Sequence, residues 1–122
     1  MQKKILLIED DDLIRDLYKT ELETAGYSID GYATGKEGLD ALGKNSYDLV
    51  LLDIMLMDTN GLIVLKAIKA NDATKDIRVI MLTNLGQDKI IKSAFELGAE
   101  GYLMKLHITP EDLVKEVKNA LQ

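Results

Sequence analysis

Cysteine is missing from this chain of 122 residues, and basic residues are fewer than acidic ones. Without cysteine the chain can form neither disulfides nor a thiolate zinc site. The 15 basic residues against 21 acidic ones give a formal net charge of −6. This balance argues against direct nucleic-acid binding, because phosphate contacts need grouped Lys and Arg side chains.

Long apolar runs and flexible linkers are missing too. No run approaches the roughly 18 residues of a membrane helix, and no Pro-, Gly- or Ser-rich stretch divides the chain. An apolar run begins almost at the N-terminus, which leaves no room for a signal peptide. We therefore expect one domain over residues 1–122, with a single core, no membrane association and a cytoplasmic location.

Short β-type runs alternate with segments of helical periodicity. The expected strands are Lys4–Ile8, Ser28–Tyr32, Asp48–Leu52, Arg78–Leu82 and Gly101–Met104. The expected helices cover Ile14–Ala25, Lys36–Gly43, Leu62–Asn71, Asp88–Leu97 and a last segment that begins after Thr109. This alternation predicts an α/β fold, a doubly wound five-stranded parallel sheet with helices on both faces.

Local signals sharpen the helix predictions. Thr109 is expected to cap the last helix, with Pro110 at its first position and Asp112 as the acid of a capping box. Helical spacing assigns Leu17 to the apolar face of the first helix and counts Ile63 among the apolar candidates of the third.

An acidic cluster, Glu9-Asp10-Asp11-Asp12, follows the first apolar run, and Asp53 follows the third. The carboxyl ends of parallel strands share one edge, where ligands bind. In the common strand order 2-1-3-4-5, strands 1 and 3 are neighbours, so these acids would converge on a hard cation such as Mg²⁺. The sequence alone does not determine this order. For the acidic cluster alone, helix capping explains the residues about as well as a metal site does. Capping accounts well for Asp11 and Asp12 but poorly for Glu9 and Asp10.

Two further strands end in polar residues, Thr83 and Lys105. A hydroxyl and an ammonium beside metal-binding acids form the layout that phosphoryl transfer needs. Asp53, flanked by the others, is the best candidate to take up phosphate as an aspartyl phosphate. Taken singly, each residue is more often a cap, a turn residue or a solvated charge, but a joint coincidence at four strand ends is much rarer.

These residues make the chain resemble the receiver domains of two-component response regulators over its whole length. The stretches that carry the resemblance are Ile5–Asp11, Asp48–Met55, Val79–Thr83 and Gly98–Lys105. The resemblance implies a phosphorylation-dependent signalling switch rather than an enzyme with independent turnover. It also implies a sensor histidine kinase or phosphotransfer protein as donor, and a downstream protein partner or a missing output domain.

The resemblance also assigns roles within the site. Asp53 corresponds to the residue that a histidine kinase phosphorylates, and Lys105 to the lysine that pairs with the phosphoryl oxygens. Glu9 and Asp10 correspond to residues that hold Mg²⁺, together with a backbone carbonyl at the position of Met55.

Switching is implied for two further residues. Thr83 corresponds to the residue that senses the phosphoryl group, and Tyr102 to the aromatic residue that turns inward as Thr83 moves. Their movement would change the face formed by the fourth helix, fifth strand and fifth helix.

Several positions depart from the family pattern. Met57 and Leu106 stand where receivers usually carry proline, and Asn84 stands where they usually carry Ala or Ser. The bond between Lys105 and Leu106 should be trans, because a cis bond before a non-proline residue costs about 2.5–4 kcal/mol. In that case we expect the ammonium of Lys105 to lie farther from Asp53. The long lysine side chain can absorb part of the shift, so phosphoryl binding should be weakened rather than absent.

Other functions remain open. A haloacid-dehalogenase-type phosphatase fits the run Asp10-Asp11-Asp12, but no later strand ends in a paired acidic motif. A flavodoxin would need a Ser-, Thr- or Gly-rich phosphate loop in place of the acids. A receiver that serves only as an interaction module would be consistent with the missing prolines. His107, the single histidine, is expected to be solvated rather than reactive.

Overall fold

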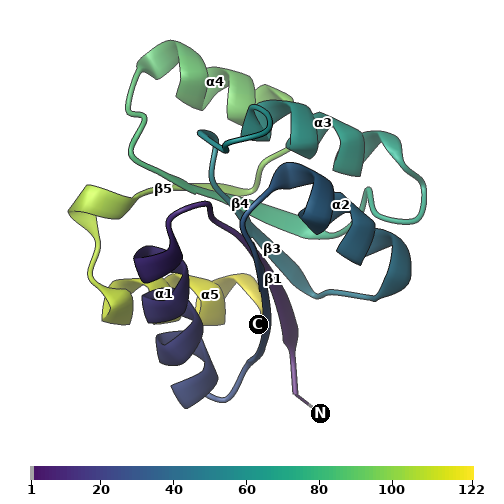
Figure 1. Cartoon of the computed structure of the whole chain (residues 1–122). Helices are drawn as coiled ribbons and strands as arrows, with labels where there is room; N and C mark the ends of the chain where they lie inside the picture. Colours follow the sequence, from purple (N-terminus) through teal and green to yellow (C-terminus); the bar gives the residue numbers. More distant parts are fainter. Residues whose placement is uncertain (1) are drawn as a thin grey trace.

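The computed structural model describes residues 2–122, which form a parallel sheet in the order β2-β1-β3-β4-β5. The strands are β1 Lys4–Ile8, β2 Ser28–Tyr32, β3 Leu49–Leu52, β4 Arg78–Thr83 and β5 Gly101–Met104. The helices are α1 Asp12–Thr24, α2 Gly35–Lys44, α3 Gly61–Ala70, α4 Asp88–Glu96 and α5 Pro110–Ala120, with a 3-10 turn, η1, at Lys105–His107. Helices α1 and α5 lie on one face of the sheet and α2, α3 and α4 on the other (Figure 1). The predicted architecture and the strand order 2-1-3-4-5 are confirmed.

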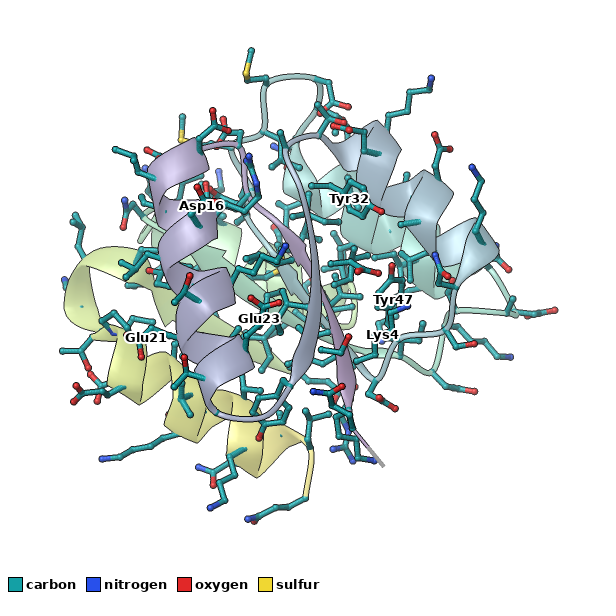
Figure 2. The ribbon with its side chains drawn as sticks, turned by 60° about the horizontal axis from the view of Figure 1, so that its bottom comes forward. Lys4, Asp16, Glu21, Glu23, Tyr32 and Tyr47 are labelled. Carbon is teal, nitrogen blue, oxygen red and sulfur yellow. The ribbon has the colours of Figure 1, made fainter. Side chains whose placement is uncertain are left out.

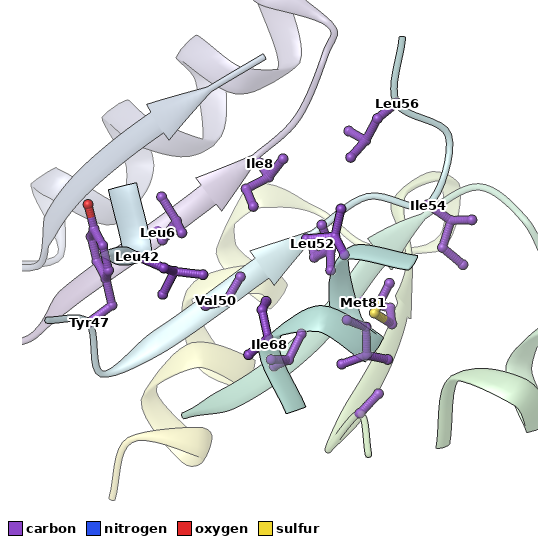
Figure 3. Close-up of a cluster of buried hydrophobic side chains, with 14 of the residues drawn as sticks. Leu6, Ile8, Leu42, Tyr47, Val50, Leu52, Ile54, Leu56, Ile68 and Met81 are labelled. Carbon is purple, nitrogen blue, oxygen red and sulfur yellow. The ribbon is translucent and has the colours of Figure 1, made fainter. Parts of the chain in front are cut away.

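The pleat of β1 divides the core into two layers. Leu6 and Ile8 face α2, α3 and α4, whereas Ile5 and Leu7 face α1 and α5, since successive side chains of a strand point to opposite faces. Figure 3 shows the first of these layers. All four side chains are at most 1% exposed, and each stabilises the fold by about 1.5–3 kcal/mol through burial. The central position of β1 follows from this two-sided apolar character.

Helix ends follow the predicted caps. Thr109 and Asp112 form a complete capping box at α5, with Pro110 in its first turn. Asp11 caps α1 by accepting the N–H groups of Leu13 and Ile14. Within residues 2–122, no helix has both the length and the apolar character needed to cross a bilayer.

The structure corrects some details. Leu17 is 47% and Ile63 is 62% exposed, because a helix on a sheet buries only one stripe. Tyr18 and Leu22 are the buried residues of α1, and the buried residues of α3 are Gly61, Val64, Leu65 and Ile68. The predictions that placed Leu17 and Ile63 on buried helix faces are therefore wrong.

Strand bounds differ by one residue at two places. Asp48 lies just before β3, and its carboxylate accepts the backbone N–H of Lys4 at 2.8 Å. Thr83 belongs to β4, where it pairs with Met104 of β5.

Candidate functional site

The site lies at the carboxyl edge of the sheet, at the ends of four strands. Glu9 follows β1, Asp53 follows β3, Thr83 ends β4 and Lys105 follows β5. Because Ile8 pairs with Leu52, the next residues on the two strands are neighbours, and the backbone N–H of Asp53 donates to the Ile8 carbonyl at 3.0 Å. The predicted convergence of these strand ends is therefore present.

A buried ion cluster joins three of these residues. The Lys105 Nζ lies 2.7 Å from Glu9 Oε1 and 2.8 Å from Asp53 Oδ2. The Lys105, Glu9 and Asp53 side chains are 9%, 1% and 5% exposed, respectively. Water screens these charges weakly, so their mutual attraction is strong and each depends on its partners.

Backbone donors hold the remaining carboxylate oxygens. Asp53 Oδ1 accepts from the N–H of Ile54 at 2.7 Å and from that of Met55 at 3.3 Å. Glu9 Oε2 accepts the N–H of Asp11 at 3.1 Å. These bonds orient both carboxylates before any ligand arrives.

Gly61, at the start of α3, allows the loop after β3 to fold back. Its N–H donates to the Ile54 carbonyl at 2.7 Å, and a Cβ at this position would collide with the Asp53 carbonyl. Only glycine fits so close to the backbone of Asp53.

Burial and pairing shift the proton affinities of the cluster. Burial raises the pKa of Glu9 above its ordinary value, and the hydrogen bonds from Lys105 and from the Asp11 N–H oppose this only in part. For Lys105, burial alone would lower the pKa, but the hydrogen bonds to Asp53 and Glu9 outweigh it and the pKa is raised. The ammonium is thus held in its charged form between the two acids.

Glu9, Asp10 and Asp53 form an acidic cluster that could hold a cation. Each offers one carboxylate oxygen, and these atoms lie within 4.8 Å of one another. With Lys105 as the paired cation, three carboxylates retain two uncompensated negative charges, which suits a divalent ion with oxygen ligands. Asp11 of the acidic run is a helix cap, whereas Glu9 and Asp10 lie with Asp53 in the acidic cluster.

A pocket of about 280 Å³ opens beside Asp53. Its lining includes Asp10, Met55, Thr83 and Asn84. The pocket brings the Asp53 carboxylate next to Asp10 of the acidic cluster and Thr83 at the end of β4.

Thr83 and Tyr102 both contact the loop after β4. Thr83 is 1% exposed, and its Oγ1 accepts the N–H of Leu85 at a long 3.5 Å. The Tyr102 hydroxyl donates to the Leu85 carbonyl at 2.6 Å. Burial, helped by the charge of Asp53, raises the pKa of Tyr102, which keeps the hydroxyl a donor. The Leu85 backbone thus links the two predicted switch residues.

The turn after β5 differs from expectation in one respect. The Lys105–Leu106 bond is trans, as predicted. The expected retreat of the ammonium from Asp53 is wrong, because the long side chain of Lys105 spans the gap and reaches 2.8 Å. His107 lies in η1 and is exposed.

Sequence reasoning missed two supporting residues. Arg15 donates to the Glu9 carbonyl at 2.8 Å and to Asp12 at 2.6 Å. Its spacing of three residues from Asp12 was a readable helical signal. Asn84 accepts the N–H of Leu106 at 3.0 Å, and only its departure from the receiver pattern marked it in advance.

Comparison with known sequences gives one consistent family. The chain matches the profile of the response regulator receiver domain over residues 5–118. It is 41% identical over 105 residues to the transcriptional regulatory protein CrdR of Helicobacter pylori, covering 86% of this chain and 49% of CrdR. It is 35% identical over 121 residues to the transcriptional regulatory protein ResD of Bacillus subtilis, covering 99% of this chain and 49% of ResD. The chain thus spans about half the length of these relatives.

Solved structures agree. A CheY-like response regulator receiver domain protein from Methanospirillum hungatei superposes with a TM-score of 0.91 at 33% identity, covering 99% of this chain and 94% of that one. The chemotaxis response regulator CheY4 of Vibrio cholerae gives a TM-score of 0.92 at 27% identity, with 99% and 100% coverage. By fold and by sequence, this chain belongs to the receiver domains of two-component response regulators, a family of phosphorylation-based signalling switches.

Proposed function

We propose that residues 1–122 form one receiver domain that accepts a phosphoryl group on Asp53. The observation that carries this proposal is the carboxylate of Asp53, buried and oriented, with Lys105 at 2.8 Å and the pocket beside it. The donor is a phosphohistidine on a sensor histidine kinase or on a phosphotransfer protein. A carboxylate is a competent nucleophile for this transfer.

The transfer exchanges one bond to phosphorus for another. An Asp53 carboxylate oxygen forms a bond to phosphorus as the phosphorus–nitrogen bond of the donor breaks, and the imidazole leaves with the electron pair. Lys105 is placed to pair with the phosphoryl oxygens, and Thr83 is placed to donate its hydroxyl proton to one of them. The product is an aspartyl phosphate without a net oxidation or reduction.

Mg²⁺ is the cofactor that we assign to the acidic edge of this pocket. Glu9, Asp10 and Asp53, with the Met55 backbone carbonyl, would hold the ion. Bound there, it would neutralise negative charge on the transferring group. The assignment of Mg²⁺ rests on three oxygen donors that lie within 4.8 Å of one another. It also rests on the negative charge of the three carboxylates that pairing with Lys105 does not neutralise.

Phosphorylation is read out through the end of β4. A phosphoryl group on Asp53 draws the Thr83 hydroxyl toward it, and the loop that includes Leu85 follows. Tyr102, bonded to the Leu85 carbonyl at 2.6 Å, then takes a more buried position. The face of α4, β5 and α5 changes shape and is the signalling surface.

The output function is expected outside the receiver domain. The relatives CrdR and ResD are transcriptional regulatory proteins about twice as long as the aligned region. The receiver would act on an output domain or on a separate protein partner, without contacting nucleic acid itself, in the cytoplasm. The chain would assist its own phosphorylation and dephosphorylation but turn over no independent substrate.

Acetyl phosphate tests the acceptor without a kinase. Incubation of the protein with Mg²⁺ and acetyl phosphate should add one phosphoryl group, seen by intact mass, as the phosphorus–oxygen bond to acetate breaks. Hydroxylamine should remove the group, because acyl phosphates react with it. Absence of the adduct under conditions in which another receiver is labelled would leave only the interaction module. Continued release of inorganic phosphate from small phosphoesters would instead indicate a phosphatase.

A further inference from the structure

A single hydrogen bond joins the two loops that border the pocket after β4 and β5. The side-chain Oδ1 of Asn84 accepts the backbone N–H of Leu106 at 3.0 Å. Asn84 directly follows Thr83, and Leu106 directly follows Lys105. The bond therefore connects the neighbours of the two side chains that we place at the phosphoryl oxygens.

The turn after β5 depends on this bond because little else of Leu106 is anchored. The Leu106 side chain is 79% exposed, so it does not pack in the core. The turn itself is one short 3-10 element, Lys105–His107, whose internal hydrogen bonds have poor geometry. Asn84, an exposed residue of the neighbouring loop, supplies the acceptor. The backbone that carries Lys105 is thereby tied to the end of β4.

The two partners complement each other chemically. Leu106 stands where receivers usually have proline, which would fix φ and would have no N–H to donate. Asn84 stands where they usually have Ala or Ser, which are too small to reach as an amide does. A donor and its acceptor thus occur together at two positions that depart from the family pattern.

We propose that Asn84 is a positioning residue for Lys105. Its hydrogen bond to Leu106 holds the turn so that the ammonium stays at Asp53. The proposal rests on the proposed function for its consequence, the rate of phosphoryl uptake. Its structural part, the placement of Lys105, is measurable on its own.

The direct readout is the NMR signal of the Lys105 ammonium. In the wild type, the hydrogen bonds to Glu9 and Asp53 should slow proton exchange and give a distinct signal. Asn84→Ala should broaden or shift this signal, because the freed turn lets the ammonium leave its partners. Asn119→Ala, on the exposed side of α5, is the matched control and should leave it unchanged.

Ligand affinities distinguish positioning from general loosening of the pocket. Asn84→Ala should weaken beryllofluoride binding, measured in Mg²⁺, by about fivefold, the usual net effect of one hydrogen bond. The affinity of Asn84→Ala for Mg²⁺ in the absence of beryllofluoride should stay equal or rise. Lys105 competes with Mg²⁺ for Glu9 and Asp53, and a displaced ammonium would compete less. A pocket that merely loses its shape would bind both ligands less well, and that result would overturn the proposal.

A double-mutant cycle isolates the bond from the extra space that alanine creates. Leu106→Pro removes the donor, so Asn84→Ala should have no further effect on the Lys105 signal or on beryllofluoride affinity in that background. Equal effects of Asn84→Ala in both backgrounds would refute the proposal. If the wild type takes up no phosphoryl group from acetyl phosphate while the ammonium signal still depends on Asn84, the proposed function fails and the positioning role stands.

Discussion

A lysine pairs with acids toward each end of the strands: with one carboxylate toward the amino edge, where β1 begins, and with two at the carboxyl edge, in different surroundings. At the amino edge, Lys4 Nζ lies 3.5 Å from Asp30 Oδ2, and the two side chains are 35% and 34% exposed. Tyr47, next to Lys4 in Figure 2, donates its hydroxyl to Asp30 at 2.6 Å. At the carboxyl edge the lysine and both acids are less than 10% exposed.

Access to water accounts for the difference in what the clusters can do. An exposed pair such as Lys4–Asp30 contributes about 0–1 kcal/mol, because solvent competes with both charges. At the buried cluster, each charge has lost its hydration and relies on its partners, so removal of one is costly. The pair toward the amino edge therefore only links neighbouring strands. At the carboxyl edge, a change of charge should alter the interactions of all three buried side chains.

The largest expected effect is the loss of phosphoryl uptake in Asp53→Asn. The amide keeps the shape of the side chain but is a poor nucleophile, so acetyl phosphate should add no mass to the protein. Asp30→Asn makes the same chemical change at the other edge of the sheet and should be labelled like the wild type. Undiminished labelling of Asp53→Asn would move the acceptor to another residue.

Lys105→Met should have the next largest effect, on stability. The substitution leaves Glu9 and Asp53 facing each other without their cation, which should lower the free energy of unfolding by about 3–5 kcal/mol. Mg²⁺ should restore part of the loss, since it binds the folded state at the same acids. Urea denaturation with and without Mg²⁺ measures both effects.

Lys4→Met is the matched change at the amino edge. Its cost should stay below about 1 kcal/mol and should not respond to Mg²⁺. Equal costs for the two lysines would show that burial does not separate the edges as we argue.

The carboxyl edge was predicted from the sequence, but the cluster at the amino edge was not. The alternation of β-type runs and helical segments predicted the parallel sheet. Strand ends then predicted which acids meet, and Glu9, Asp10 and Asp53 do lie together. Such predictions succeed because strand period and parallel topology place residues without any knowledge of side-chain conformation.

Contacts between loops could not be predicted from the sequence. The reach of Asn84 to Leu106 depends on the path of two loops, which no periodicity encodes. Leu17 and Ile63 fit an apolar helical pattern but are exposed, since the width of the buried stripe depends on how each helix rests on the sheet.

Thr83→Ala should have a moderate effect, on switching rather than on chemistry. Asp53 and Lys105 are unchanged, so phosphoryl uptake should persist. Loss of one hydroxyl contact, about 1 kcal/mol, should reduce the population of the switched state about fivefold relative to the resting state. The NMR signals of the Tyr102 ring on beryllofluoride addition report this population. A full wild-type response in the variant would remove Thr83 from the switch.

A small effect, on stability alone, is expected for Tyr47→Phe at the amino edge. The phenol is raised in pKa by burial and by its hydrogen bond to Asp30, so it is a neutral donor throughout the usual pH range. Its removal should lower the free energy of unfolding by about 0.5–1.5 kcal/mol, the net value of one hydrogen bond, because Asp30 remains partly hydrated. Phosphoryl uptake should be unchanged, since the hydroxyl lies at the edge opposite Asp53. A slower uptake in Tyr47→Phe than in Asn119→Ala would mean that the two edges are coupled through β1 and β3, and the comparison between an inert and a reactive edge would have to be abandoned.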